Sequence, residues 1–111
     1  MISMISGIVE ELGPNYATVN VNGVGYKLFV TSDTLRTLKT ARPVKMWTHL
    51  AVREDALDLY GFTKKSEQEF FQLLISVSGI GPKSALNILS LAPSETLTGA
   101  IRTGSTTHLI K

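Results

Sequence analysis

The sequence has no cysteine and only two histidines among its 111 residues. The lack of cysteine excludes disulfide bonds and thiolate metal sites. Neither His49 nor His108 has an aspartate or glutamate beside it at metal-ligand spacing, so no metal site is expected. The phosphate-binding pattern of ATPases is absent, and no glycine motif opens a long dinucleotide-binding helix. We therefore expect no cofactor and no catalytic residues.

Long hydrophobic runs and a strong net charge are also lacking. No stretch approaches the roughly 18 apolar residues of a membrane span, and no signal-peptide pattern opens the chain. The balance of 43% hydrophobic and 18% charged residues is typical of a globular protein, and the lack of cysteine fits a cytoplasmic location. A net charge of +2 is far too small for a protein that binds DNA by charge alone. Any such binding must use backbone amides, a few lysines and several copies of the chain.

The first 62 residues show the two-residue alternation that is typical of β-strands. The expected strands cover residues 2–12, 16–21, 24–30, 44–50 and 57–62. Asn22-Gly23 predicts a type I′ hairpin turn between the second and third strands. A short helix with Ser32 as its N-cap is expected after the third strand. Five short strands with one such helix favour an OB-type barrel, although strand count alone leaves SH3-like barrels open.

At Thr63 the hydrophobic period changes to that of helices. Residues 63–65 are expected to be a linker, and residues 66–69 a capping box that opens a helix over 70–77. Further helices are expected from Pro82 to Leu91 and over 95–102, the last one closed by Gly104. The sequence thus predicts an α+β protein with two domains, a five-stranded OB-fold barrel at 1–62 and a helical domain at 63–111.

The stretch Gly79-Ile80-Gly81-Pro82-Lys83-Ser84 joins two of these helices by a very short turn. The two glycines can take a positive φ or let another backbone come close. Pro82 suits the first position of a helix, where free amides favour an anion such as phosphate. This pattern resembles the helix-hairpin-helix motif, which binds nucleic-acid backbone without reading bases. The alternative is an ordinary turn between helices, with glycine for tightness and lysine for solubility.

A second polar turn, Arg53-Glu54-Asp55, joins the fourth and fifth strands. Acidic residues at a hairpin tip are usually solvated turn formers, and taken alone these two would be no more than that.

The whole chain resembles the N-terminal two-thirds of bacterial proteins of the RuvA family, which bind Holliday junctions in the RuvAB branch-migration machine. The matching blocks are Met1-Ile2 with Gly7, residues 21–26, residues 52–56 with 59–62, and residues 76–85. The resemblance implies an OB-fold domain that builds a homotetramer, of which two can stack. It also implies a helical domain with two helix-hairpin-helix motifs, and a third domain, absent from this chain, that recruits the RuvB ATPase.

Residue roles follow from the resemblance, position by position. It implies DNA-backbone contacts by Gly79, Ile80, Gly81, Lys83 and Ser84. It makes Glu54 and Asp55 an acidic pin at the junction centre, with Arg53 beside it as a further DNA contact. The implied partners are four-way junction DNA, RuvB and the RuvC resolvase, and the implied setting is recombination, DNA repair and the SOS response in the bacterial cytoplasm.

This chain departs from the family pattern in two places. The second hairpin motif is expected just after Lys111, so the chain is expected to be a fragment. Met4 and Ser6 stand in the first strand, where the family often has a basic residue.

Two other functions stay open at this point. A general single-strand or duplex binder would stack bases on exposed aromatics. Tyr16, Tyr26, Trp47 and Tyr60 are few, and at least half of them fall in the phase of the barrel core. A nuclease or glycosylase fragment would need a catalytic carboxylate or lysine beside the glycine turn, and none is evident.

Overall fold

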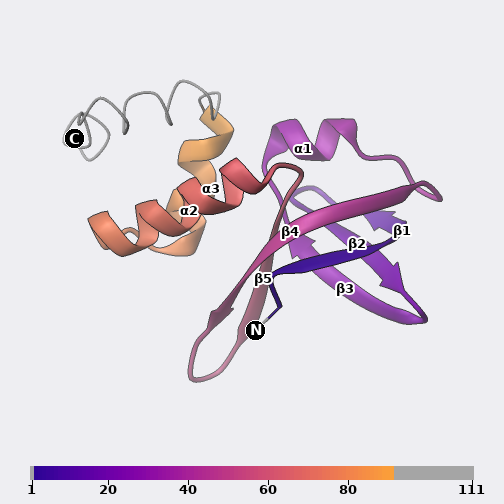
Figure 1. Cartoon of the computed structure of the whole chain (residues 1–111), viewed down its shortest axis with the longest axis horizontal. Coiled ribbons are helices and arrows are strands. Elements are labelled where there is room, and N and C mark those ends of the chain that lie inside the picture. Colours follow the sequence, from indigo (N-terminus) through magenta and orange to yellow (C-terminus); the bar gives the residue numbers. More distant parts are fainter. Residues whose placement is uncertain (1, 92–111) are drawn as a thin grey trace.

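The computed structural model of the chain describes residues 2–91 (Figure 1). The helix expected at 95–102, Gly104 and His108 lie outside these residues. The elements are β1 (Met4–Leu12), β2 (Tyr16–Val21), β3 (Val24–Phe29), α1 (Ser32–Thr37), β4 (Pro43–Val52), β5 (Leu57–Phe62), α2 (Lys65–Ser78) and α3 (Pro82–Leu91). Within the described residues no helix has the length and apolar character that crossing a membrane requires.

The five strands form a closed barrel in the order β1-β2-β3-β5-β4. The β3–β5 pair is parallel, and the other four pairs are antiparallel. This order, with α1 between β3 and β4, confirms the prediction of an OB-like barrel.

Closure of the barrel depends on β1, which pairs with β4 through its first half and with β2 through its second. Ile8 pairs with both partners, and a register shift follows between Val9 and Glu11, within the pairing with β2. A Cβ atom at Gly7 would lie 2.2 Å from the carbonyl oxygen of Asn20, so only glycine allows this approach. The turn between β2 and β3 has φ values of 52° at Asn22 and 91° at Gly23, which confirms the type I′ prediction.

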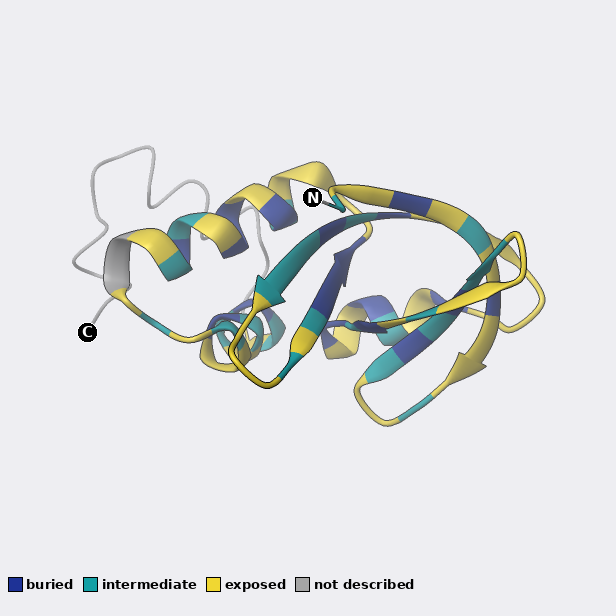
Figure 2. Ribbon diagram, turned by 90° about the horizontal axis from the view of Figure 1, so that it is seen from below, coloured by how far each residue is buried: buried dark blue, intermediate teal, exposed yellow. Residues whose placement is uncertain are grey.

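The barrel core is made of inward-facing aliphatic side chains, as the strand alternation predicts. They are Ile5, Val19, Leu28, Val30, Met46 and Leu59. Figure 2 shows buried and exposed positions alternating along the strands, with the hairpin tips exposed.

The N-cap of α1 is Thr31, so the prediction of Ser32 was wrong by one residue. Thr31 has an extended backbone, and its side-chain oxygen accepts a hydrogen bond from the Thr34 N–H at 3.2 Å. Both threonines are buried under the helix, so packing against the barrel decides which hydroxyl caps it.

The capping box predicted at residues 66–69 was also wrong, because α2 begins earlier, at Lys65. Its N-cap is Lys64, which has no side-chain cap, and Ser66 lies within the first turn. The register of the helix is set by Gln68, whose buried Nε2 donates to the carbonyl oxygens of Thr48 at 2.6 Å and Ser3 at 3.2 Å. Contact with the barrel therefore outweighs the local capping preference.

Helix α2 packs on the outside of the barrel against β4 and β5, and α3 packs against α2 (Figure 1). One apolar cluster joins the two parts and contains Tyr60, Phe62, Phe70, Phe71, Leu74, Ala85 and Leu89. Three aromatic rings form its centre, since Phe71 lies 5.2 Å from Tyr60 and 4.9 Å from Phe62 between ring centroids. The division into domains at residues 62 and 63 stays a prediction, and a shared core spans it.

Candidate nucleic-acid interface

The turn between α2 and α3, residues 79–81, is here called the glycine turn. Gly79 ends α2 in the left-handed region, with φ 71° and ψ 14°. Gly81 has no positive φ, and its carbonyl oxygen accepts the Ala85 N–H at 3.0 Å, so Pro82 is the first helical residue as predicted. A Cβ atom at either glycine would meet nothing within 4 Å. The glycines thus leave the outer side of the turn open to another molecule.

Side chains next to the glycine turn point in two directions. Ile80 and Ala85 pack against the shared apolar cluster, which fixes the turn to the body of the molecule. Lys83 and Ser84 are exposed in the first turn of α3. The first amides of a helix have no acceptor inside the helix, and the dipole is positive at that end. The structure therefore brings together all five residues predicted around this turn, in an arrangement suited to a phosphate group.

The turn between β4 and β5, residues 53–56, is here called the acidic turn. The Arg53 N–H donates to the Ala56 carbonyl at 2.9 Å, which closes the turn and leaves Glu54 and Asp55 exposed at its tip. Figure 1 shows this hairpin extending away from the barrel. Val52 and Leu57, the last paired residues below the tip, are 60% and 69% exposed. The tip thus presents two carboxylates above a small apolar surface.

Arg53, predicted as a DNA contact, forms an ion pair with Asp58 of β5, with Nη2 and Oδ2 2.7 Å apart. The arginine side chain stays 55% exposed, whereas Asp58 is only 20% exposed. Sequence spacing gave no indication of this pair, which forms because the hairpin brings residues five apart to the same side.

Four lysine–aromatic contacts, in two groups on the barrel surface, were missed at the sequence level. The Lys27 ammonium lies 4.3 Å from the Tyr16 ring centroid and 5.4 Å from that of Phe29. The Trp47 ring has Lys45 at 4.9 Å and Lys65 at 5.5 Å. Lys27 and Phe29 stand two apart on β3, as Lys45 and Trp47 do on β4, and this alternation was the signal in the sequence.

His49 and the carboxylates give no sign of a metal centre. The His49 ring packs edge-on against Phe71 at 5.4 Å, and its Nδ1 lies 3.3 Å from the Gln72 amide nitrogen. Burial lowers the pKa of His49. Across the part of the chain that the structure describes, no three metal-ligating side chains gather at one place.

The fold and these two turns define a class of protein, an OB-like barrel with a pair of helices joined by a glycine turn. The chain belongs to the RuvA family, because the family model described as "RuvA N terminal domain" matches residues 1–61.

Curated relatives cover nearly the whole chain. The chain is 43% identical over 105 residues to a protein of Caldanaerobacter subterraneus subsp. tengcongensis, which covers 94% of this chain and 56% of the relative. It is 45% identical over 101 residues to a protein of Micrococcus luteus, and this match covers 91% of this chain and 47% of the relative. It is 39% identical over 111 residues to a protein of Desulforamulus reducens, and this match covers 100% of this chain and 55% of the relative. Each is named "Holliday junction branch migration complex subunit RuvA". The chain spans about half the length of these relatives.

Proposed function

We propose that this chain is the DNA-binding part of a non-catalytic subunit that binds four-way DNA junctions through the sugar-phosphate backbone. The names of the relatives support this proposal, since they describe a subunit of a branch migration complex. In this proposal residues 1–62 form the OB-fold domain and residues 63–111 belong to the helix-hairpin-helix domain. Strand movement is driven by the RuvB ATPase, a separate chain.

The observation that carries the proposal is the glycine turn. Gly79, Ile80, Gly81, Lys83 and Ser84 contact a phosphate there, with amides and one lysine in place of base-reading groups. Binding of this kind is independent of sequence and weakens with salt. A junction offers many backbones in a fixed arrangement, so shape rather than sequence selects it.

Glu54 and Asp55 form the acidic pin of this proposal, placed at the centre of the junction. Carboxylates repel phosphates by about 1 kcal/mol per pair at 4 Å in water, and by more where solvent is excluded. A surface made only for affinity would carry lysine there, so the carboxylates serve to keep the crossing strands apart. Arg53 orients the acidic turn through Asp58 and keeps enough exposure for a phosphate contact.

The proposed assembly is a homotetramer, with the stacking of two tetramers and the RuvC resolvase as further expectations of the family. Two or three phosphate contacts per chain release too few counterions for tight binding, whereas four copies multiply the contacts and match the four arms. Exposed apolar side chains on the outer face of β1, Met4 and Ile8, support self-association. Sedimentation of the chain over a range of concentrations tests this: a species of four chains is expected, and a strict monomer that prefers junctions contradicts it.

A general single-strand or duplex DNA binder is the second candidate. Tyr60 is buried and Tyr26 packs against the barrel core, but Tyr16 and Trp47 lie outward with lysines over their rings. Such lysine–aromatic pairs suit stacked bases beside phosphates.

The experiment for the phosphate site uses Gly81→Val, which fills the open side of the glycine turn without disturbing a positive φ. Fluorescence anisotropy is expected to show weaker binding to junction and duplex by the same factor, about tenfold, with the unfolding of the chain unchanged. Thr40→Val, an exposed loop position, is the control and should bind as wild type does. Wild-type affinity of the Gly81→Val variant for both DNA shapes would remove the glycine turn from the binding site.

A further inference from the structure

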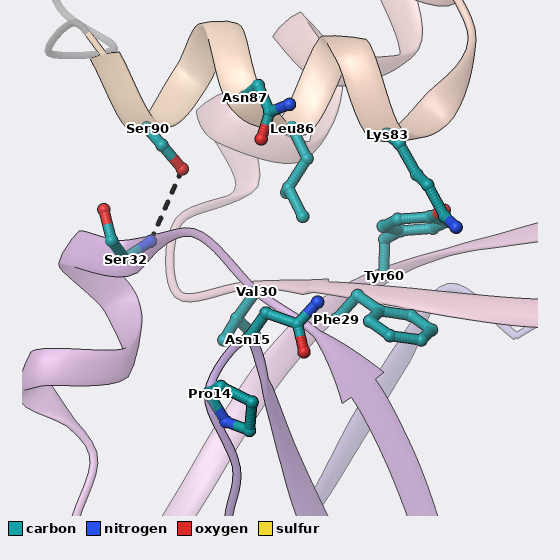
Figure 3. A pocket seen from close by; sticks show the side chains of 10 residues that line it. All are labelled: Pro14, Asn15, Phe29, Val30, Ser32, Tyr60, Lys83, Leu86, Asn87 and Ser90. Atoms are coloured by element: carbon teal, nitrogen blue, oxygen red, sulfur yellow. Dashed lines mark hydrogen bonds between the residues drawn. The ribbon is translucent and has the colours of Figure 1, made fainter.

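A cleft of about 390 Å³ lies between α3 and the barrel, next to the glycine turn (Figure 3). Lys83, Leu86 and Asn87 line it from α3. Phe29 of β3 and Asn15 of the β1–β2 loop line the opposite side. Figure 3 shows Lys83 and Leu86 extending from the helix toward the barrel. The β2–β3 surface and the β1–β2 loop are where OB folds commonly bind oligonucleotides, so the cleft lies at a position suited to them.

The barrel side of the cleft offers a flat aromatic surface. The half-buried Phe29 ring is held at 5.6 Å and 40° against the buried Tyr60. The Lys27 ammonium lies over the Phe29 ring, 5.4 Å from its centroid, and over the Tyr16 ring, 4.3 Å from that centroid. Aromatic rings that are held by packing and have a cation close to them are the combination with which proteins bind single-stranded bases.

Two amides face the space between the helix and the barrel. Asn15 and Asn87 are exposed, and their side chains form no hydrogen bond with any other described residue. Each amide carries both a donor and an acceptor, which is the combination that the edge of an unpaired base presents.

The lining of the cleft carries one positive charge, and a hydrogen bond joins the two helices at one end of it. No aspartate or glutamate is among its ten lining residues, and Lys83 is its only charged one. Lys83 also belongs to the first turn of α3, directly after the glycine turn. The Ser32 N–H donates to Ser90 Oγ at 3.4 Å, which joins α1 and α3 at one end of the cleft (Figure 3). An anionic ligand would thus be held at the end nearest the proposed phosphate site.

We propose that this cleft binds one unpaired nucleotide of the DNA strand whose backbone lies on the glycine turn. The base stacks on Phe29 and meets the amides of Asn15 and Asn87, and its phosphate is shared with Lys83. The volume of the cleft falls within the 300–1,000 Å³ of typical small-ligand sites, which is enough for one nucleotide. The inference rests on the proposed function, and it adds a ligand that the backbone contacts do not require.

The test compares two duplexes of the same length, one fully paired and one with a 2-aminopurine opposite an abasic site. The whole chain is expected to bind the second duplex about fivefold more tightly and to quench its 2-aminopurine emission as the base stacks. Asn87→Ala is expected to abolish this preference and to leave affinity for the paired duplex unchanged. Asn87 is exposed on a helix, where alanine is well tolerated, so the variant is expected to fold. Gln72→Ala, another exposed helical amide, lies outside the cleft and is the matched control.

The outcomes separate the cleft from the glycine turn. If the wild type binds paired DNA but shows no preference for the unpaired base, or if Asn87→Ala keeps the preference, the cleft assignment is overturned and the proposed function stands. If the wild type binds neither duplex nor junction, the proposed function fails and the cleft assignment fails with it. If Asn87→Ala keeps the preference but changes the sedimentation of the chain, the cleft is a contact between copies.

Discussion

Gly79 and Gly81 stand two residues apart in the glycine turn and differ in backbone conformation. Only Gly79 has a positive φ, 71°, while both have free space where a side chain would lie. An L-residue in the left-handed region loses roughly 1–2 kcal/mol. A side chain at Gly79 is therefore expected to lower the stability of the fold. A side chain at Gly81 is expected to change only what can approach the turn.

We expect Gly79→Ala to lower the free energy of unfolding by about 1 kcal/mol. Gly81→Ala should leave it unchanged or raise it by about 0.5 kcal/mol, since alanine restricts the unfolded chain at no cost to a permitted backbone. Urea denaturation of the two variants and the wild type measures both effects. Equal destabilisation by the two substitutions would contradict the assignment of the left-handed position to Gly79.

At the residue scale, we expect His49 to make the stability of the chain depend on pH. Burial against Phe71 lowers the pKa of His49 in the folded state, so the folded chain binds its proton less readily than the unfolded chain does. The contribution of His49 to stability is thus complete above the unfolded pKa of about 6.5 and is lost as the pH falls below it. In the wild type, the urea concentration at the midpoint of unfolding should decrease from pH 7.5 through pH 6.5 to pH 5.5.

His49→Gln is the control for this pH effect, because it removes the titrating group and keeps a polar side chain beside Gln72. Its urea midpoint should change less over the same pH interval. The pKa of Glu67 is raised chiefly by burial. Its effect on stability has the opposite sign and occurs at lower pH, because the contribution of Glu67 to stability falls as the pH rises through its folded pKa. A wild type and a His49→Gln variant with equal pH slopes would show that His49 is not the group responsible.

At the scale of elements, the Arg53–Asp58 ion pair links the acidic turn to β5 in the β4–β5 hairpin. The pair is partly exposed, so we expect a double-mutant cycle with Arg53→Met and Asp58→Asn to give a coupling free energy of about 0.5 kcal/mol. Unfolding of the four proteins in urea at low salt measures it. A coupling of zero would mean that Arg53 does not bind Asp58 in solution and is free for DNA.

Sequence patterns predicted the elements of the barrel well, because each depends on neighbouring residues. Alternation gave β5 at residues 57–62 without error, and Asn22-Gly23 gave the turn with two positive φ values. Helix starts were predicted less well. Thr31 caps α1 in place of Ser32, and α2 starts at Lys65, because burial of Thr34 and Gln68 against the barrel decides both.

The candidate site likewise has features that neighbouring residues determine and features that only the fold determines. The glycine turn lies within one stretch of sequence, so its residues could be named before its geometry was known. The Arg53–Asp58 pair, the lysines over Tyr16 and Trp47, and the cleft between Asn15 and Asn87 join distant or unpatterned positions. Their partners follow from the closure of the barrel and from the packing of α3, which no local pattern encodes.

At the scale of the whole molecule, the glycine turn joins α2 to α3 with Lys83 just after it, whereas the acidic turn joins β4 to β5 and carries Glu54 and Asp55 at its tip. The barrel and the shared cluster around Phe71 hold them in a fixed relation. In the proposed function the first of these sites attracts DNA backbones and the second repels them, so the proposed preference for junctions comes from their arrangement rather than from net charge.

We expect Glu54→Gln combined with Asp55→Asn to bind every DNA shape more tightly and to discriminate less between junction and duplex. The salt dependence should rise only slightly, because the phosphate-contacting lysine is unchanged. Anisotropy titrations at several salt concentrations measure both quantities. If the double variant binds junctions no better than the wild type and discriminates equally well, Glu54 and Asp55 are ordinary turn residues.

Competition for the wild-type chain between a labelled four-way junction and unlabelled DNA of equal length is the most direct test of junction binding. We expect unlabelled junction to displace the label at a concentration about tenfold lower than duplex or single strand does, a difference of about 1.4 kcal/mol. Equal displacement by junction and duplex, or stronger displacement by single strand, would contradict it.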